Sequence, residues 1–436
     1  TTEIYTLSLH DALPIFDAVI QQQLPELLTT FKTLHSHPEL SHYEKNTARL
    51  MATRLADMGY TVTEQFGQYE NPRWICYGVV AMLKNGPGPT VLYRADMDAL
   101  PIEEETDLPY CSTVKMNNDE GEPVAVMHAC GHDMHSTVLL GIAQTLIKLR
   151  SEWSGTLLLI VQPAEEVNDS GGHALMRAGL YEKFPRPDYT LAMHTNAEVR
   201  AGDIRYISGS CMADVTSIDI TVRGVGGHGA APHKCIDPIV LSSQIVLALQ
   251  TIVSREIIPL EPAVVTVGSI HGGTARNIIP ESVVLQLTLR CYKTKVRDQM
   301  IAAIKRICEG QARAAGVPEE RLPLVEWLGS GPAVYNDPEL TDRVKVSMES
   351  ALGKEHLLPG HPVMGAEDFA AYSDNGKIPS ALFWLGITDR ERFDAFQKSG
   401  TPIAAGHSPR FTIEPEPAIR TGVKAMATAL MDLLKK

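Results

Sequence analysis

One short stretch of the chain, residues 127–135, concentrates side chains that bind metals. Its sequence is Met-His-Ala-Cys-Gly-His-Asp-Met-His, which places a thiol, three imidazoles and a carboxylate within nine positions. Farther along come the paired glutamates Glu165 and Glu166, and then His194 and His407. Thiolate, imidazole and carboxylate groups are the ligands of zinc and its neighbours. One glutamate can bind metal while the other transfers a proton, so the set indicates a metal-dependent hydrolase.

Composition narrows the class of protein. A chain of 436 residues is too long for one ordinary core, which predicts two domains. The hydrophobic fraction of 44% and charged fraction of 21% are typical of a soluble globular protein. A net charge of −13 argues against a nucleic-acid partner. We find no apolar run long enough to span a membrane and expect no membrane partner. Seven scattered cysteines, an odd number, predict a reduced, cytoplasmic enzyme.

The first sixteen residues do not join the helical pattern that follows. They lack the basic start and the small-residue cleavage site of a secretory signal. We therefore leave residues 1–16 as an unassigned N-terminal segment.

Short apolar runs alternate with helical patterns over residues 17–209. Residues 90–94, 156–161 and 189–193 are predicted buried strands, and residues 137–149 a helix. This alternation predicts an α/β fold with a mainly parallel central sheet. The candidate ligands follow apolar strands, which is where such sheets place their sites.

The pattern changes near residue 210. Strand, helix, two strands, helix and strand follow one another, which makes a β-α-β-β-α-β unit. These predicted elements are residues 215–223, 239–254, 263–270, 283–292, 296–315 and 322–327. The α/β pattern then resumes near Pro338. We therefore predict a catalytic metal-binding domain, residues 17–209 and 332–436, interrupted by an inserted α+β lid or dimerisation domain, residues 210–331.

Six motifs, in their order along the chain, resemble the zinc metallopeptidase family that contains aminoacylases, carboxypeptidase G and peptidase T. They resemble most its amidohydrolase branch: hippurate hydrolase, N-acyl-L-amino acid amidohydrolases and the plant hydrolases of indole-acetyl–amino acid conjugates. The motifs are RADMDALP at 94–101, HACGHD at 128–133, QPAEE at 162–166, GHGAAPH at 227–233, GTARNIIP at 273–280 and MGAEDF at 364–369. One such motif is weak evidence, but the six in order are specific. The family's catalytic domain also carries an inserted lid.

The resemblance implies a site for two divalent metal ions. Its ligands here are Cys130, His132, Glu166, His194 and His407, and in this branch the cysteine can bridge the two ions. A thiolate suits zinc, with manganese, cobalt or nickel as possible replacements. From the residues alone, Cys130 and His132 lie two apart, so in an extended segment both side chains would point the same way. The alternative is a buried thiol beside a loop histidine.

Glu165 is the candidate general base. It precedes a predicted ligand, so its carboxylate can reach a metal-bound water, take its proton and return that proton to the leaving amine. The alternative is a solvated glutamate at a helix start. The apolar, strand-terminal segment 161–164 favours the catalytic role.

Asp96 and Asp98 alternate at the end of a predicted strand, where a carboxylate can orient a ligand histidine. The wider family has a His-x-Asp-x-x-Pro motif, and aligning Pro101 places Asp96 at its histidine and Asp98 at its aspartate. The chain therefore departs from the family at Asp96, and we predict that Asp98 is the orienting residue. Turn capping by both aspartates is the alternative.

Three residues of the predicted inserted domain are candidates for contact with the substrate. His228 lies in a glycine-rich turn, and the family's matching histidine enters the partner subunit's site and stabilises the oxyanion. Asn277 precedes Pro280 and matches a substrate contact of the family. Arg290 ends a buried-type strand, where a lone charge needs a reason, and the family uses a nearby arginine for the substrate carboxylate. Without the resemblance, His228 and Asn277 are ordinary turn residues.

Together these features predict a metal-dependent amidohydrolase that cleaves N-acyl amino acids or similar small conjugates and forms a homodimer through its inserted domain. A dipeptidase or carboxypeptidase with the same dinuclear site is the nearest alternative. A non-catalytic metal-binding protein is an alternative of another class, but it would not need Glu165 beside Glu166. A closed structural zinc site is usually cysteine-rich and local in sequence, unlike this one.

Overall fold

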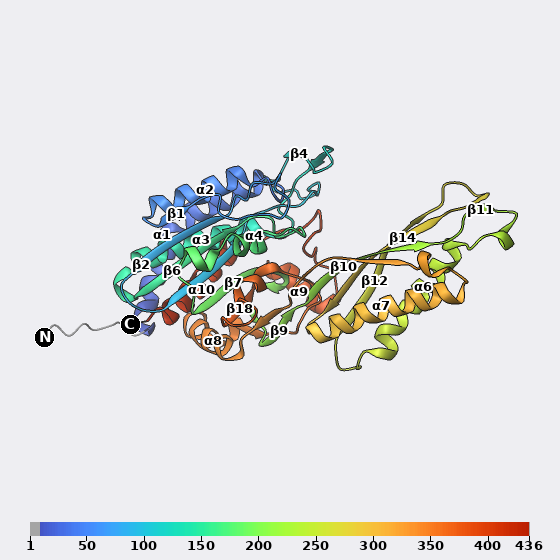
Figure 1. Cartoon of the computed structure of the whole chain (residues 1–436). Helices are drawn as coiled ribbons and strands as arrows, with labels where there is room; N and C mark the ends of the chain where they lie inside the picture. The colour runs from blue at the N-terminus through green and yellow to red at the C-terminus, as the bar shows by residue number, and fades with distance from the viewer. Residues whose placement is uncertain (1–8, 436) are drawn as a thin grey trace. The chain divides into compact units, whose positions relative to one another are not determined.

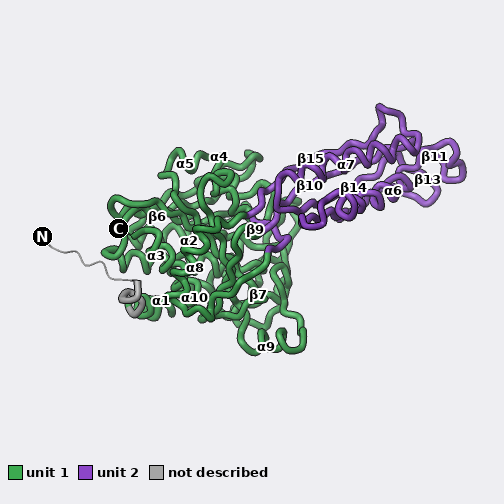
Figure 2. Tube along the Cα trace, turned by 90° about the horizontal axis from the view of Figure 1, so that it is seen from below, with its two compact units in different colours: residues 1–211, 335–361, 368–436 green, residues 212–334, 362–367 purple. Residues whose placement is uncertain are grey.

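The computed structural model describes residues 9–435, with side chains described from residue 15 onward. The chain folds into two compact units (Figure 2). Unit 1 contains the described residues up to 211, together with 335–361 and those from 368 onward. Unit 2 contains residues 212–334 and 362–367. The prediction of an inserted domain at 210–331 did not include the short segment 362–367.

The core of unit 1 is an eight-stranded sheet in the order β1-β2-β6-β3-β7-β18-β8-β17 (Figure 1). Its strands are β1 (Thr61–Thr63), β2 (Val79–Asn85), β3 (Thr90–Asp96), β6 (Gly155–Gln162), β7 (Tyr189–Arg200), β8 (Ile204–Tyr206), β17 (Leu357–Pro359) and β18 (Ser380–Thr388). The neighbours β6, β3, β7 and β18 run parallel to one another. The predicted mainly parallel α/β sheet is confirmed, with antiparallel pairings only toward its margins.

Helices pack against this sheet, because their apolar faces and the buried strands form one common core. They are α1 (Leu9–Ser36), α2 (Lys45–Asp57), α3 (His132–Lys148), α8 (Pro338–Leu352) and α10 (Pro415–Leu433). Three shorter helices of unit 1, α4 (Gly171–Arg177), α5 (Leu180–Lys183) and α9 (Arg390–Ser399), lie outside this core. Helices α1, α3 and α10 all pack against one another. Four short strands form two further pairs: the hairpin of β4 (Lys115–Asn117) and β5 (Pro123–Ala125), and the ladder of β9 (Gly209–Met212) with β16 (Val334–Asn336).

Helix α1 begins at Leu9, so residues 9–16 belong to a helix, contrary to the predicted unassigned segment 1–16. Phe16, Ile20 and Leu24 recur every four residues, and all three are buried. The apolar stripe therefore begins before residue 17, and the helix extends back to Leu9. Residues 1–8 lie outside the described residues.

Unit 2 contains a four-stranded antiparallel sheet in the order β12-β14-β10-β15. Its elements are β10 (Asp214–Arg223), α6 (Pro238–Thr251), β12 (Ala263–Gly272), β14 (Ser282–Cys291), α7 (Thr294–Ala314) and β15 (Leu324–Gly331). Every second residue of β10 is buried, because helices cover only one face of the sheet. The predicted β-α-β-β-α-β order is confirmed. A separate ladder pairs β11 (Gly227–His228) with β13 (Ile278–Ile279).

The stretch Pro238–Glu256 is long and apolar enough to cross a membrane by length and composition alone. This corrects the prediction that no such run exists. Leu241, Ile245 and Leu249 of this stretch pack into the core of unit 2, whereas Leu247 is 73% exposed. This distribution is that of an amphipathic helix covering a sheet.

Candidate metal centre

Cys130 and His132 lie where the chain turns into α3. His132 is the first residue of the helix, and Gly131 before it has a φ of 86°. A Cβ on Gly131 would lie 2.5 Å from Oγ1 of Thr195. Glycine is therefore needed both for the left-handed turn and for the close approach. The predicted extended segment was wrong: a turn, and not strand alternation, directs the thiol and the imidazole toward each other.

The five predicted ligands meet within unit 1. Sγ of Cys130 lies 3.5 Å from Nε2 of His194. Oε1 of Glu166 lies 3.9 Å from Nε2 of His132 and 3.2 Å from Nε2 of His407. Ligands bound about 2.0–2.3 Å from a tetrahedral ion lie roughly 3.3–3.7 Å apart, and the Cys130–His194 and Glu166–His407 separations are close to this range.

The ligand atoms form two groups that share the sulfur of Cys130. One group adds His132 and His194, and the other adds Glu166 and His407. Within each group the atoms lie within 4.8 Å of one another. A shared sulfur between two groups is the arrangement that two adjacent ions need.

Two buried atoms of the cluster lack hydrogen-bond partners, namely Nε2 of His132 and Oε1 of Glu166. The other ring nitrogen of His132, Nδ1, lies 3.2 Å from Oδ1 of Asp98 and donates to it, which leaves the Nε2 lone pair free. Burying such atoms without a partner is unfavourable. A divalent cation would satisfy both, so the residues present fit a metal.

Charge in the cluster also fits a cation. Burial lowers the pKa of His194 to about 3, which keeps the ring neutral as a metal ligand must be. Burial and then the Glu166 charge raise the pKa of the Cys130 thiol. The neighbouring Cys130 thiol and then the Glu166 carboxylate, 3.2 Å from Nε2 of His407, raise the pKa of His407 to about 10. The Glu166 charge contributes to both of the last two shifts, and a divalent ion would neutralise it.

Glu165 lies on a loop whose backbone is held on both sides. The N–H of Ala164, a residue with a φ of 50°, donates to Oε1 of the buried Glu44 at 2.7 Å. The N–H of Glu166 donates to Oδ2 of Asp98 at 3.1 Å. The Glu165 carboxylate lies within 4.8 Å of the ligand oxygen of Glu166. These two anchors place Glu165 beside the ligands.

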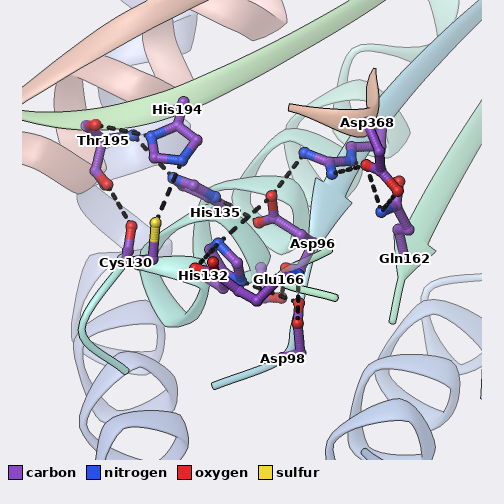
Figure 3. Close-up of polar contacts among 12 residues, drawn as sticks. Asp96, Asp98, Cys130, His132, His135, Gln162, Glu166, His194, Thr195 and Asp368 are labelled. Atoms are coloured by element: carbon purple, nitrogen blue, oxygen red, sulfur yellow. Dashed lines mark hydrogen bonds and ion pairs between the residues drawn. The ribbon is translucent and has the colours of Figure 1, made fainter. Parts of the chain in front are cut away.

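The two aspartates at the end of β3 have different partners (Figure 3). Asp98 accepts from His132, from the Glu166 N–H and from Oγ of Ser41 at 2.7 Å. Asp96 instead accepts from Nη1 of Arg94 at 2.6 Å and faces Nδ1 of His135 at 2.5 Å. Asp98 therefore hydrogen-bonds to a predicted ligand, whereas Asp96 is bonded to Arg94 and His135 and lies 3.7 Å from Nε2 of His132.

The predicted substrate contacts all lie in unit 2 but not together. His228 and Asn277 are exposed and adjacent, because the Gly229 N–H donates to the Asn277 carbonyl at 2.9 Å. Arg290 lies near the far end of β14, eight residues after Ser282. At about 3.3 Å per residue, roughly 25 Å of strand separates Arg290 from the end of β14 nearest Asn277.

Three residues near the site were not predicted to act there. His135 lies between Asp96 and Thr195, and Glu44 supports the Glu165 loop. Two features of the sequence could have pointed to His135. It lies one helical turn after the predicted ligand His132, and Asp96, where the wider family has a histidine, needs a partner of its own. No comparable signal marked Thr195 or Glu44.

Residues 92–432 match the model of peptidase family M20/M25/M40, which covers more than half of the chain. The chain belongs to this family. The predicted family is therefore confirmed, and the match includes every residue of the ligand cluster.

Known M20 proteins are similar over almost the whole chain. Thermostable carboxypeptidase 1 of Saccharolobus solfataricus is 36% identical, over 92% of this chain and 93% of its own. N-acetylcysteine deacetylase of Bacillus subtilis is 32% identical, over 89% and 92%. A solved dinuclear metal-binding peptidase of the M20 family from Bacillus subtilis has a TM-score of 0.74 and 27% identity, covering 95% of this chain and 99% of that structure. This M20 chain is thus a metal-dependent amidohydrolase with a site for two divalent ions, as predicted.

The cluster predicts which cysteine controls metal binding. Cys130→Ser should weaken metal binding by more than about 100-fold, because the serine hydroxyl is a poor substitute for a thiolate ligand. The loss of a residue that only hydrogen-bonds to a ligand typically weakens binding by about 10–100-fold. A competition titration of the metal against a chromogenic chelator measures the change. Cys76→Ser and Cys308→Ser are the controls, since both thiols are buried outside the cluster. Equal effects from all three substitutions would make Cys130 an ordinary buried thiol.

Proposed function

We propose that this enzyme hydrolyses the amide bond of N-acyl amino acids or similar small conjugates, with Glu165 as general base. The observation that carries the proposal is the pair Glu165 and Glu166. Glu166 belongs to the ligand group with Cys130 and His407, while the Glu165 carboxylate lies beside it and outside that group. A protein that only bound metal would not need the second carboxylate. The similarity to an N-acetylcysteine deacetylase supports the substrate class.

The chemistry divides between the ions and the chain. Cys130, His132, Glu166, His194 and His407 would hold two divalent ions, which polarise the scissile carbonyl and lower the pKa of the attacking water. Zinc is the expected metal because of the thiolate, with manganese, cobalt or nickel as substitutes.

The side chains then position groups and move the proton. Glu165 takes the proton of the attacking water and returns it to the nitrogen of the leaving amine as the amide bond breaks. Asp98 holds His132 in the tautomer whose Nε2 faces the cluster. The anchored N–H groups of Ala164 and Glu166 keep the Glu165 carboxylate in reach of the attacking water and of the leaving nitrogen.

A carboxypeptidase is the second candidate, because a relative of that name is 36% identical. The two functions use the same centre and differ in whether an acyl group or a peptide occupies the substrate pocket. A panel of N-acetyl, N-benzoyl and indole-acetyl amino acids beside dipeptides and blocked peptides separates them. The proposal expects the highest kcat/KM among the N-acyl amino acids, and a clear preference for peptides would replace it with the alternative.

Removing the Glu165 carboxylate tests the general base. Glu165→Gln should keep the metal but lower kcat by about 100–10,000-fold, since the amide has the shape of the carboxylate and cannot take a proton. Glu166→Ala is the matched comparison and should lose metal instead. Steady-state kinetics and metal analysis of the same samples measure both effects. A near-normal kcat for Glu165→Gln would remove Glu165 from the mechanism.

We propose that Arg290 receives the carboxylate of the substrate. Burial lowers the pKa of this guanidinium, and among the described residues it has no carboxylate within ion-pair distance. The nearby Asp214 is already paired with Arg297 at 3.1 Å. An unpaired, half-buried guanidinium can bind a planar carboxylate through two parallel hydrogen bonds.

We propose that His228 and Asn277 serve the site of a partner subunit. Roughly 25 Å of strand separates them from Arg290 in the same unit, so one small substrate cannot touch all three within one chain. Apolar exposure on unit 2 supports a homodimer: Leu247 of α6 is 73% exposed and Ile270 of β12 is 51% exposed. Strand β12 is also an edge strand, with one side open for pairing.

We expect the enzyme to work in the cytoplasm. All seven cysteines lie in the described part of the chain and are free thiols. Free thiols accord with a reducing compartment.

Mixed dimers test the cross-subunit role. His228→Ala and Glu165→Gln should each be inactive alone, but a mixed dimer has one site with both residues intact. Mixing them under conditions of proven subunit exchange should therefore restore up to about a quarter of wild-type activity for random pairing, because half the dimers are mixed and each has one good site. Fluorescence transfer between labelled chains controls for exchange. Exchange without recovery would place His228 outside the partner's site.

A further inference from the structure

A fully buried histidine outside the ligand set lies behind the metal centre. His135, on α3, is 2% exposed and lies between Asp96 and Thr195 (Figure 3). Its Nδ1 is 2.5 Å from Oδ1 of Asp96. Its Nε2 accepts a hydrogen bond from the backbone N–H of Thr195 at 2.8 Å.

These two contacts fix the form of the His135 ring. A backbone N–H can only donate, so Nε2 must present its lone pair to Thr195. The ring proton is therefore on Nδ1 and is donated to Asp96. Both nitrogens are used, so His135 has no lone pair for a metal, although it lies within 4.8 Å of ligand atoms of Asp96 and His132.

Thr195 connects this ring to two of the metal ligands. Its carbonyl accepts from Nδ1 of His194 at 2.8 Å, which leaves Nε2 of His194 to face the sulfur of Cys130. Its hydroxyl donates to the Cys130 carbonyl at 2.8 Å. Gly131 has no Cβ, and this permits the close approach of Thr195. One residue thus sets the orientation of His194 and the backbone position of Cys130.

Asp96 connects the other side of the ring to a buried ionic network. Nη1 of Arg94 donates to Oδ2 of Asp96 at 2.6 Å, and Nη2 donates to Oδ1 of Asp368 at 2.9 Å. The amide of Gln162 donates to the same Asp368 carboxylate at 2.8 Å. Arg94 is 1% exposed, so neither Asp96 nor Arg94 can be rehydrated without opening the core. Asp96 is therefore a rigid support for His135.

We propose that Arg94, Asp96, His135 and Thr195 form a relay of hydrogen bonds that positions Cys130 and His194 for metal, with His135 as its central positioning residue. The inference rests on the proposed function, because it concerns the same centre. It also accounts for the departure from the family pattern: Asp96 acts on the centre through His135 and Thr195 and is not itself a ligand. An apolar core residue at 135 would fill the space but would break both connections.

Two substitutions cut the relay on opposite sides of the ring. In His135→Asn the amide nitrogen can take the place of Nδ1, which keeps the bond to Asp96 and loses the acceptor for Thr195. In His135→Gln the amide oxygen can take the place of Nε2, which keeps the acceptor for Thr195 and loses the bond to Asp96. The His135 ring is connected to Cys130 and His194 through Thr195. His135→Asn breaks that connection, so it should disturb the two metal ligands more than His135→Gln does.

Cobalt reports on ligand position without requiring turnover. The full-length enzyme is loaded with Co²⁺, and its dissociation constant is measured by competition while the thiolate-to-cobalt and d–d absorption bands are recorded. We expect His135→Asn to weaken cobalt binding roughly 10–100-fold and to shift the bands, and His135→Gln to have a smaller effect. Leu139→Ala, one turn along α3 and fully buried, is the control: it should lower the unfolding midpoint and leave both cobalt readouts unchanged.

The outcomes separate the two proposals. Wild-type affinity and bands in His135→Asn would overturn the relay, as would equal effects from Leu139→Ala. If His135→Asn does not fold, Thr195→Val tests the relay at its last bond instead, because it removes the hydroxyl that donates to the Cys130 carbonyl and keeps the backbone N–H that donates to His135; unchanged cobalt bands would again overturn the relay. A wild-type enzyme that binds cobalt but cleaves no N-acyl amino acid would refute the proposed function and leave the relay standing. A wild type without cobalt at this cluster would refute both.

Discussion

A buried nitrogen and a buried oxygen that face each other without a hydrogen bond impose the main constraint on this molecule. They are Nε2 of His132 and Oε1 of Glu166. A buried polar atom without a partner costs on the order of 1–3 kcal/mol, and here two of them share one cluster. A cation satisfies both lone pairs at once and also neutralises the Glu166 charge, which contributes to the raised pKa values of Cys130 and His407. The arrangement therefore fits a metal centre.

The parallel sheet brings the ligands to one place. Strands β6, β3 and β7 are neighbours and run parallel, so their carboxyl ends meet at one edge of the sheet. Strand β3 leads to Asp98, β6 leads to Glu165 and Glu166, and β7 carries His194. Residues that hydrogen-bond to the ligands then select the histidine tautomers. Asp98 accepts from Nδ1 of His132, and the Thr195 carbonyl accepts from Nδ1 of His194.

Sequence motifs predicted side chains that the structure brings together, but not the hydrogen bonds that hold them. Cys130, His132 and Glu166 could be found because ligand chemistry restricts residue type. The turn at Gly131 and the contact of His135 with Thr195, sixty residues away, could not, because they depend on which strands become neighbours. The start of α1 was misplaced for a different reason: Phe16 was assigned to the segment before the helix, although it belongs to the buried stripe.

Anomalous X-ray scattering from crystals of the zinc-loaded enzyme, recorded on both sides of the zinc absorption edge, tests the central claim most directly. The account predicts two peaks about 3.5–4 Å apart, both within bonding distance of the Cys130 sulfur, with one near His132 and His194 and the other near Glu166 and His407. It also predicts no peak bonded to Asp96 or His135. A single ion away from Cys130, an ion held by Asp96 and His135, or no peak in a crystal of active enzyme would contradict it.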